Sequence, residues 1–144
     1  MIAGGLARTM EAMSYRTQEM GAPLVIVSLQ RRVFAMDVAT GERKWSFDDV
    51  MSRVEVVGNR VFVLGHRLSC LDYVTGKEHW SAALPHIART LLVHGDYVVV
   101  AGVGEASCYS ATGRLLWHDE FGGEGVAAVG LAVPGSSAQA DRDH

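Results

Sequence analysis

The sequence predicts an all-β protein built from three consecutive antiparallel units of similar length. Two residue series predict this repeat. Thr-Gly pairs fall at 40/41, 75/76 and 112/113, and tryptophans fall at 45, 80 and 117. Both series step by 35 and then 37 residues, and Trp follows Gly by four residues in every unit. Landmarks that stay in phase over three copies indicate a structural repeat.

Each Thr-Gly pair is expected to form a turn between two strands. Asp37 and Asp72 precede the first two pairs by three residues. An Asp side chain accepts hydrogen bonds from backbone N–H groups two residues further on, and Gly takes the positive-φ position. Around the first turn we expect strands over 33–36 and 43–47, the second with clear alternation of apolar and polar residues.

Two more strands are expected upstream of the turn in units two and three. In the second unit they span 54–57 and 61–64 and are joined by Gly58-Asn59. In the third unit they span 91–93 and 97–100 and are joined by residues 94–96. Turn residues separate each pair at hairpin length. A full unit is therefore four antiparallel strands, which is the architecture of a β-propeller blade.

Over residues 24–121 the units resemble the quinoprotein-type (PQQ-like) β-propeller repeat, a strand, Asp-x-x-Thr-Gly and a strand ending in Trp. The resemblance implies that each Trp packs against an adjacent blade near a glycine of a neighbouring repeat. The residues given this blade-docking role are Trp45, Trp80, Trp117, Gly41, Gly76 and Gly113.

Dehydrogenases of that family bind PQQ and Ca²⁺ in an eight-bladed ring and use an adjacent pair of cysteines. This chain has only Cys70 and Cys108, in separate repeats at positions that do not quite correspond. We read them as small buried thiols, with a disulfide or a metal role as alternatives. None of the six histidines forms a metal-binding motif, and exposed strand or loop positions account for them. We therefore expect no catalytic residue, no cofactor and no metal.

The first unit starts late and the chain continues past the third Trp. Only the strand 24–28 precedes the first motif strand, so this unit lacks its first strand. An apolar stretch, 126–133, follows the third unit and is expected to be a further strand. Its candidates for pairing with another subunit are Val126, Val129, Leu131 and Val133, and a polar tail over 134–144 follows. The extra strand expected at the C-terminal end corresponds to the strand that is missing from the first unit.

Three blades cannot close a ring, because propellers have about four to eight. Two copies in a head-to-tail arrangement would give six blades with twofold symmetry. We expect a homodimer in which strand 126–133 completes the first blade of the partner, so that residues 23–133 form one propeller segment. Pairing with a different propeller fragment is the alternative.

The N-terminal segment, 1–22, is expected to contain an amphipathic helix. Leu6, Met10, Met13 and Met20 recur at helical spacing and form one apolar stripe. Such a stripe either caps the propeller of its own chain or docks on another protein.

The composition argues against two classes of partner. The net charge is −3, so no basic field exists to bind nucleic acid. No apolar run approaches the length of a membrane helix, and no signal sequence is apparent, so a cytoplasmic location is expected. Eleven arginines against two lysines, with many Ala, Gly and Val residues, suggest a bacterial source.

The expected function is a non-enzymatic scaffold or adaptor that mediates protein–protein interactions in a bacterial complex. No nucleophile motif or phosphate-binding loop is present. The alternative is a propeller that binds a small ligand or a quinone in its central channel.

Overall fold

The computed structural model describes residues 23–50, 52–123 and 129–138, and within them it is built from antiparallel strands with a single 3₁₀ turn, η1, at Phe121–Gly123. The first sheet contains β1 (Leu24–Ser28), β2 (Arg32–Asp37) and β3 (Arg43–Asp48). The second contains β4 (Arg53–Val57), β5 (Arg60–Leu64), β6 (Leu68–Asp72) and β7 (Glu78–Ala82). The third contains β8 (Thr90–His94), β9 (Tyr97–Ala101), β10 (Ala106–Ser110) and β11 (Leu115–Asp119).

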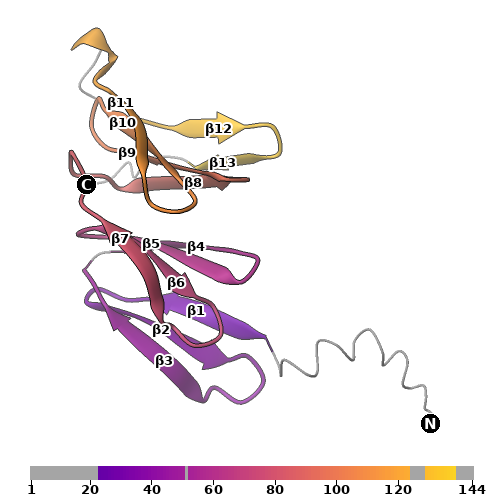
Figure 1. Cartoon of the computed structure of the whole chain (residues 1–144). Helices are drawn as coiled ribbons and strands as arrows, with labels where there is room; N and C mark the ends of the chain where they lie inside the picture. Colours follow the sequence, from indigo (N-terminus) through magenta and orange to yellow (C-terminus); the bar gives the residue numbers. More distant parts are fainter. Residues whose placement is uncertain (1–22, 51, 124–128, 139–144) are drawn as a thin grey trace.

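The three sheets follow one another through space in chain order, from β1–β3 at the bottom of Figure 1 to β8–β11 at the top. Within each sheet the strands pair in sequence order, so every connection inside a blade is a hairpin. The prediction of propeller blades is confirmed. The expected N-terminal helix, the Met-containing stripe at 1–22 and the tail residues 139–144 lie outside the described residues.

In the part of the chain that the structure describes, the first blade lacks the strand that begins the other two. Strand β1 pairs with β2 through Leu24 and Asp37, as β5 pairs with β6 through Arg60 and Asp72. Strand β1 is therefore the equivalent of β5 and β9, and the equivalent of β4 and β8 is missing from the described part of this blade.

Each Thr-Gly turn is held by the side chain that ends the strand before it. Asp37 Oδ1 accepts hydrogen bonds from the backbone N–H groups of Ala39 and Thr40 at 2.8 and 3.1 Å. Asp72 Oδ2 accepts from Val74 and Thr75 at 3.1 and 2.9 Å. These hydrogen bonds favour the ionised carboxylate, and the one from Thr75 N–H is the largest influence that lowers the pKa of Asp72.

The third turn is one residue shorter, and a serine replaces the aspartate. Ser110 Oγ accepts hydrogen bonds from the backbone N–H groups of Thr112 and Arg114 at 3.3 and 3.1 Å. The shorter turn corrects the expectation that the two cysteines occupy different repeat positions. Cys70 pairs with Trp80 and Cys108 pairs with Trp117, and both ladders shift register directly after the cysteine.

Both cysteines are buried free thiols, and burial raises the pKa of each thiol above its ordinary value. A raised pKa leaves little reactive thiolate, so these side chains act as small core residues.

The core lies between the blades. One cluster joins Val33 of the first blade to Val61, Val63 and Leu71 of the second, and all four are fully buried. A larger cluster joins the second and third blades, including Phe62, Leu64, Leu68, Cys70, Val98, Val100 and Tyr109. Because each cluster needs side chains from two sheets, an isolated blade could not bury its own apolar face.

The C-terminal part differs from the expected single strand over 126–133. Residues 126–128 lie outside the described part, Val129 precedes the strand, and Leu131 and Val133 are the ends of β12 (Leu131–Val133). A second strand, β13 (Ser136–Ala138), follows in the segment expected to be a polar tail. The reason is the turn at Pro134-Gly135, where Gly135 takes φ +85° and closes a hairpin.

This hairpin copies the start of a blade. Two-residue turns at Gly58-Asn59 and Gly95-Asp96 close β4–β5 and β8–β9 in the same way. Strands β12 and β13 both contact β8, as β8 contacts β4 (Figure 1). The chain therefore begins a fourth blade. Among the described residues, no helix has the length and apolar character needed to cross a membrane.

Candidate functional site

The indole of Trp45, on the last strand of the first blade, lies on the turn of the second blade. It covers Gly76, where an added Cβ would stand 2.5 Å from the indole Cγ and 2.8 Å from Cε3. Trp45 Nε1 donates a hydrogen bond to the carbonyl oxygen of Tyr73 in the same turn at 2.9 Å. Gly76 also has φ +75°. Glycine is therefore required there both for the close approach and for the backbone conformation.

Trp80 makes the same contact one blade further on. A Cβ at Gly113 would stand 2.7 Å from Cδ2 and Cε3 of this indole. Trp80 Nε1 donates to the carbonyl oxygen of Ala111 at 2.8 Å. One rule thus joins successive blades: an indole packs on the glycine of the next turn, and its N–H group bonds to that turn.

Trp117 and Gly41 are the two halves of this contact left unmatched among the described residues. The Trp117 side chain is 47% exposed, whereas Trp45 and Trp80 are half-buried. A Cβ at Gly41 would meet only Cε of Met36, a residue of its own blade, at 3.9 Å. Gly41 keeps the turn conformation of its equivalents, with φ +78°. The third blade therefore presents an indole, and the first blade presents a turn that has the shape to receive one.

Three valines at equivalent positions on β1, β5 and β9 show the same asymmetry between the ends and the interior of the segment. Val25, Val61 and Val98 occupy equivalent positions in their blades. Each directly follows the residue that pairs with the last residue of the next strand. Val61 and Val98 are fully buried against the preceding blade, whereas Val25 is 44% exposed. The face of the first blade is therefore an interface surface without a preceding blade in the described chain.

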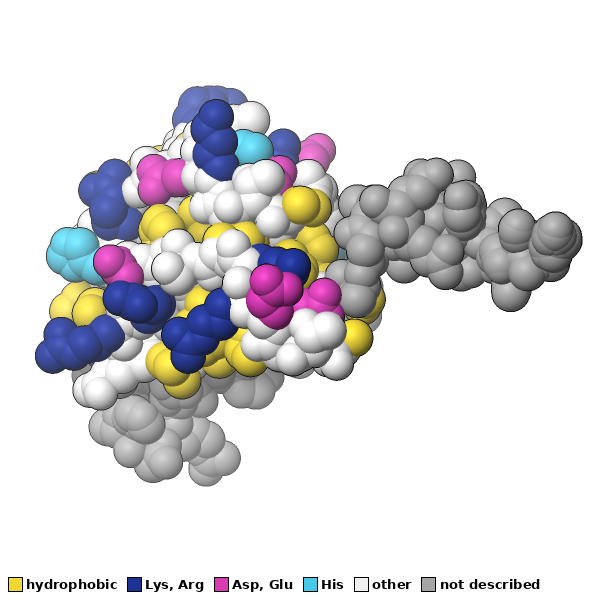
Figure 2. Space-filling view, turned by 90° about the horizontal axis from the view of Figure 1, so that it is seen from below, with side chains coloured by type: hydrophobic (Ala, Val, Ile, Leu, Met, Phe, Trp, Pro, Cys, Tyr) yellow, Lys and Arg dark blue, Asp and Glu magenta, His cyan; other side chains and the backbone are white. Residues whose placement is uncertain are grey.

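Both ends of the segment carry exposed apolar side chains. Val25, Leu29 and Val38 are exposed on the first blade, and Tyr97, Leu115 and Trp117 are exposed on the third. Figure 2 views the molecule from below, and hydrophobic surface emerges between Lys and Arg side chains there. Val25 has fully buried equivalents in Val61 and Val98, and Trp117 is more exposed than its equivalents Trp45 and Trp80, which marks both ends as docking surfaces.

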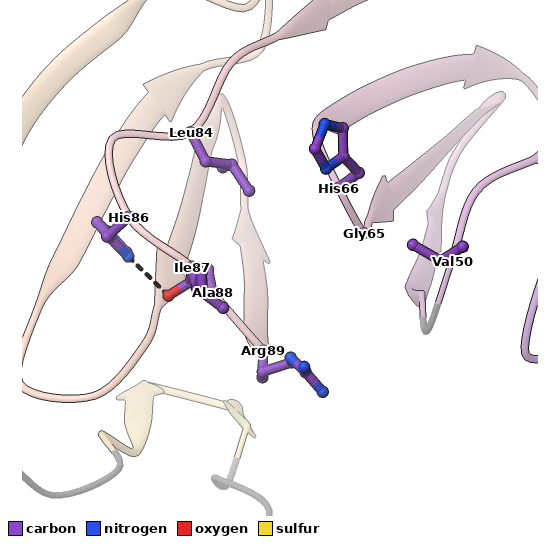
Figure 3. Close-up of a pocket in the computed structure, with 8 residues that line it drawn as sticks. All are labelled: Val50, Gly65, His66, Leu84, His86, Ile87, Ala88 and Arg89. Atoms are coloured by element: carbon purple, nitrogen blue, oxygen red, sulfur yellow. Dashed lines mark hydrogen bonds between the residues drawn. The ribbon is translucent and has the colours of Figure 1, made fainter.

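A separate hollow of about 440 Å³ lies where the linkers between blades meet the second blade (Figure 3). His66 and Val50 lie on one side of it, and the linker that contains Leu84 and His86 lies on the other. The lining residues include no carboxylate and no thiol: Val50, Gly65, His66, Leu84, His86, Ile87, Ala88 and Arg89. Ca²⁺ prefers several oxygen ligands, so this hollow does not fit a calcium-dependent quinone site.

The remaining positions expected to bear function are divided between the described and the undescribed parts. Leu131 and Val133 lie in β12 beside β8. Leu6, Met10, Met13, Met20 and Val126 lie outside the described residues. The sequence did hold a signal for the hairpin that was missed, namely a Pro-Gly pair directly after an apolar strand.

Comparisons with known proteins agree with this architecture. The PQQ_2 family model, described as outer membrane protein assembly factor BamB, matches residues 30–141. The chain is 33% identical over 114 residues to the quinoprotein alcohol dehydrogenase PedH of Pseudomonas putida, a match that covers 60% of this chain and 19% of PedH. It is 29% identical over 117 residues to the quinohemoprotein alcohol dehydrogenase ADH IIB of Pseudomonas putida, which covers 60% of this chain and 17% of that protein. The chain thus spans about a fifth of the length of the curated relatives it matches.

Two solved structures show the same fold. The quinohemoprotein alcohol dehydrogenase from Comamonas testosteroni superposes with a TM-score of 0.57 at 26% identity, over 67% of this chain and 19% of that one. BamB from Moraxella catarrhalis superposes with a TM-score of 0.54 at 20% identity, over 69% of this chain and 34% of that one.

Proposed function

We propose a function from one premise: the chain belongs to the PQQ_2 family of β-propeller repeats, described as outer membrane protein assembly factor BamB. The chain acts as a non-enzymatic scaffold or adaptor for protein–protein interactions, and two copies share one six-bladed ring. The protein-binding surfaces are then the faces and rims of that ring.

The observation that carries the proposal is the pair of complementary ends. Trp117 is exposed at one end of the segment. At the other end Gly41, in a turn like those that receive Trp45 and Trp80, is not covered by an indole. The two internal contacts, Trp45 on Gly76 and Trp80 on Gly113, show what an indole does at such a turn. A second copy carries the matching half for both ends, so two copies satisfy each other with two identical contacts.

Closing the ring requires one rearrangement. Within the described residues the first blade of the partner lacks only its first strand, whereas the C-terminal hairpin offers two. Strand β12 fits the missing position, and β13 occupies the position that β1 of the partner needs. Strand β1 contributes five residues, Leu-Val-Ile-Val-Ser, and β13 contributes three, Ser-Ser-Ala. The longer and more apolar strand displaces the shorter one.

The site chemistry favours a scaffold over a quinone enzyme. The two thiols are buried in separate blades, each paired with a tryptophan, and cannot form an adjacent pair. Trp45 and Trp80 are held by the next blade. We expect PQQ with Ca²⁺ to give no saturable change in absorbance or heat on titration into the chain. Saturable binding at one site per chain would instead favour the ligand-binding alternative.

The main test measures self-association by sedimentation velocity. Trp117→Ala is expected to raise the dimer dissociation constant roughly 10³-fold, because a buried Trp at an interface contributes about 2 kcal/mol or more and the dimer loses two such contacts. Ile87→Ser is the matched control, since Ile87 is 79% exposed and lies in a linker away from both ends. A dimer that is equally stable in both variants would overturn the proposal.

A second pair of variants tests the other half of the contact. Gly41→Ala and Gly95→Ala place a methyl group on glycines of positive φ where, among the described residues, an added Cβ would meet at most Met36 Cε at 3.9 Å. Both substitutions strain the turn, but only Gly41 is expected to receive an indole. Self-association should weaken in Gly41→Ala and remain unchanged in Gly95→Ala.

A mixing experiment separates a shared ring from general destabilisation. A Trp117→Ala chain and a Gly41→Ala chain together hold one intact contact, between Trp117 of the second and Gly41 of the first. Mixing them should therefore yield heterodimers at concentrations where each variant alone is monomeric. If the mixture stays monomeric, the two residues do not face each other.

A further inference from the structure

Three segments of the third blade bring two histidines and a glutamate together at one end of the sheet. His86 lies in the linker before β8, Glu105 lies in the loop between β9 and β10, and His118 lies on β11. One ligand atom from each side chain lies within 4.8 Å of the other two. The three positions are far apart in the sequence and form no motif, so the sequence alone gave no sign of the cluster.

Glu105 and His118 are already in contact. His118 Nε2 lies 2.9 Å from Glu105 Oε1, and the two side chains are 27% and 32% exposed. The imidazole rings of His86 and His118 are stacked, with centroids 5.3 Å apart and planes inclined by 22°. The cluster is thus partly shielded from water and still reachable from solvent.

The neutral His86 ring has the tautomer that a metal ligand needs. Its Nδ1 lies 3.0 Å from the carbonyl oxygen of Ile87, which can only accept, so Nδ1–H is the donor (Figure 3). Its Nε2 then carries the lone pair, to which the hydroxyl of Ser107 donates at 2.9 Å, and this hydroxyl must turn away for Nε2 to bind a metal ion. A backbone carbonyl on the far nitrogen is the usual second-shell arrangement of a metal-binding histidine.

The backbone around the cluster is fixed independently of the side chains. A Cβ at Gly102 would collide with the carbonyl oxygen of Ile87 and stand 3.2 Å from His86 Nδ1, so only glycine lets the linker pack on this loop. Arg89 N–H donates to the Ala101 carbonyl at 2.9 Å, and Gly102 N–H donates to the Glu105 carbonyl at 2.9 Å. Two of the three ligand-bearing segments are therefore held against each other by the main chain.

We propose that His86, Glu105 and His118 form a binding site for a divalent transition-metal ion, with Zn²⁺ as the best match. Two imidazole nitrogens and one carboxylate oxygen suit Zn²⁺, whereas Ca²⁺ and Mg²⁺ take oxygen ligands. Zn–N distances of about 2.0–2.1 Å place tetrahedral ligand atoms roughly 3.3 Å apart. The three ligand atoms, which lie within 4.8 Å of one another, must move closer by side-chain rotation to reach this separation, and water takes the fourth position.

The test is metal binding by the tag-free full-length chain. Isothermal titration with Zn²⁺ should show one ion per chain, and Co²⁺ should give visible d–d absorption without a sulfur charge-transfer band. His86→Ala, His118→Ala and Glu105→Gln should each lower the Zn²⁺ affinity about tenfold or more, because even outer-shell partners contribute 10–100-fold. His94→Ala is the matched control, since His94 is exposed at the opposite end of β8.

The melting temperature with and without Zn²⁺ is a second measurement, which distinguishes loss of metal binding from loss of folding. Zn²⁺ should raise the melting temperature of the wild-type chain and of His94→Ala by mass action, and should raise that of Glu105→Gln clearly less at the same Zn²⁺ concentration. The near-isosteric Gln keeps the fold while it removes the charged ligand. No binding by the wild-type chain, or binding of equal affinity in all four variants, would overturn the site. Neither result depends on whether the ring is shared.

Discussion

At the scale of single residues, the glycine of each Thr-Gly turn determines how closely two blades pack. Gly76 and Gly113 combine a positive φ with an indole in van der Waals contact, so two separate requirements exclude a side chain there. Gly58 and Gly95 have only the first requirement, because no other described residue has an atom within 4 Å of the place a Cβ would take.

This difference gives a prediction for stability. Gly95→Ala should cost about 1 kcal/mol of unfolding free energy, the strain of an L-residue at positive φ. Gly76→Ala should cost a further 1–3 kcal/mol or so, because the methyl group displaces Trp45 from its hydrogen bond with Tyr73. Urea unfolding of the two variants measures the difference. Equal losses would show that the Trp45 contact contributes nothing.

Glu55 gives a prediction about pH. It lies on β4 and accepts a hydrogen bond from the Val93 N–H group on β8 at 3.2 Å, and burial raises its pKa above the ordinary 4.5. The folded state therefore holds this proton more tightly than the unfolded state. The contribution of Glu55 is favourable below about pH 4.5 and is lost as pH rises through the folded pKa.

Glu55→Gln keeps the acceptor oxygen and removes the charge. The variant should be more stable than the wild-type chain at pH 7, and the difference should shrink as pH falls towards 4.5. Chemical denaturation at a series of pH values measures it. Glu78→Gln, at an exposed carboxylate on β7, controls for the loss of one negative charge. A difference that grows on acidification would contradict the assignment.

At the scale of strands and hairpins, the two strands of the short C-terminal hairpin are expected to behave differently in a shared ring. Ala132 on β12 and Ser137 on β13 lie directly opposite each other. In the proposed dimer β12 fills the missing strand of the partner, and β13 gives up its place to β1.

Proline at each position tests this distinction, because proline removes a backbone donor and fits poorly inside a strand. Ala132→Pro should weaken self-association, whereas Ser137→Pro should leave it unchanged or strengthen it. Sedimentation velocity on the two variants provides the comparison. Equal weakening would mean that both strands stay in the interface.

The same elements show what the sequence could and could not predict. The blade strands were predictable because alternation, turn residues and the Trp-Gly spacing are local signals. Strand β13 was harder to predict, since Ser-Ser-Ala has no strand pattern and only the Pro-Gly pair before it signals the turn at Gly135 on which its pairing depends. The His86 cluster was hidden because three chain segments meet only in the folded blade. The equivalence of the cysteines required the register, which the shorter third turn concealed.

At the scale of the whole molecule, the segment has an open first blade and an open third blade. The cores lie between blades, so each open end exposes a residue whose equivalents are less exposed inside the segment: Val25, whose equivalents are fully buried, and Trp117, whose equivalents are half-buried. A contact repeated head to tail either closes into a ring or grows into a fibre. The count of three blades per chain favours closure at two copies, since six lies within the known range.

The native mass of the wild-type chain over a range of concentrations tests this account most directly. The account predicts a species of two chains, twice the 15.5 kDa of one, whose mass does not increase further with concentration. A chain that remains a monomer, or a mass that keeps growing beyond two copies, would contradict the shared ring.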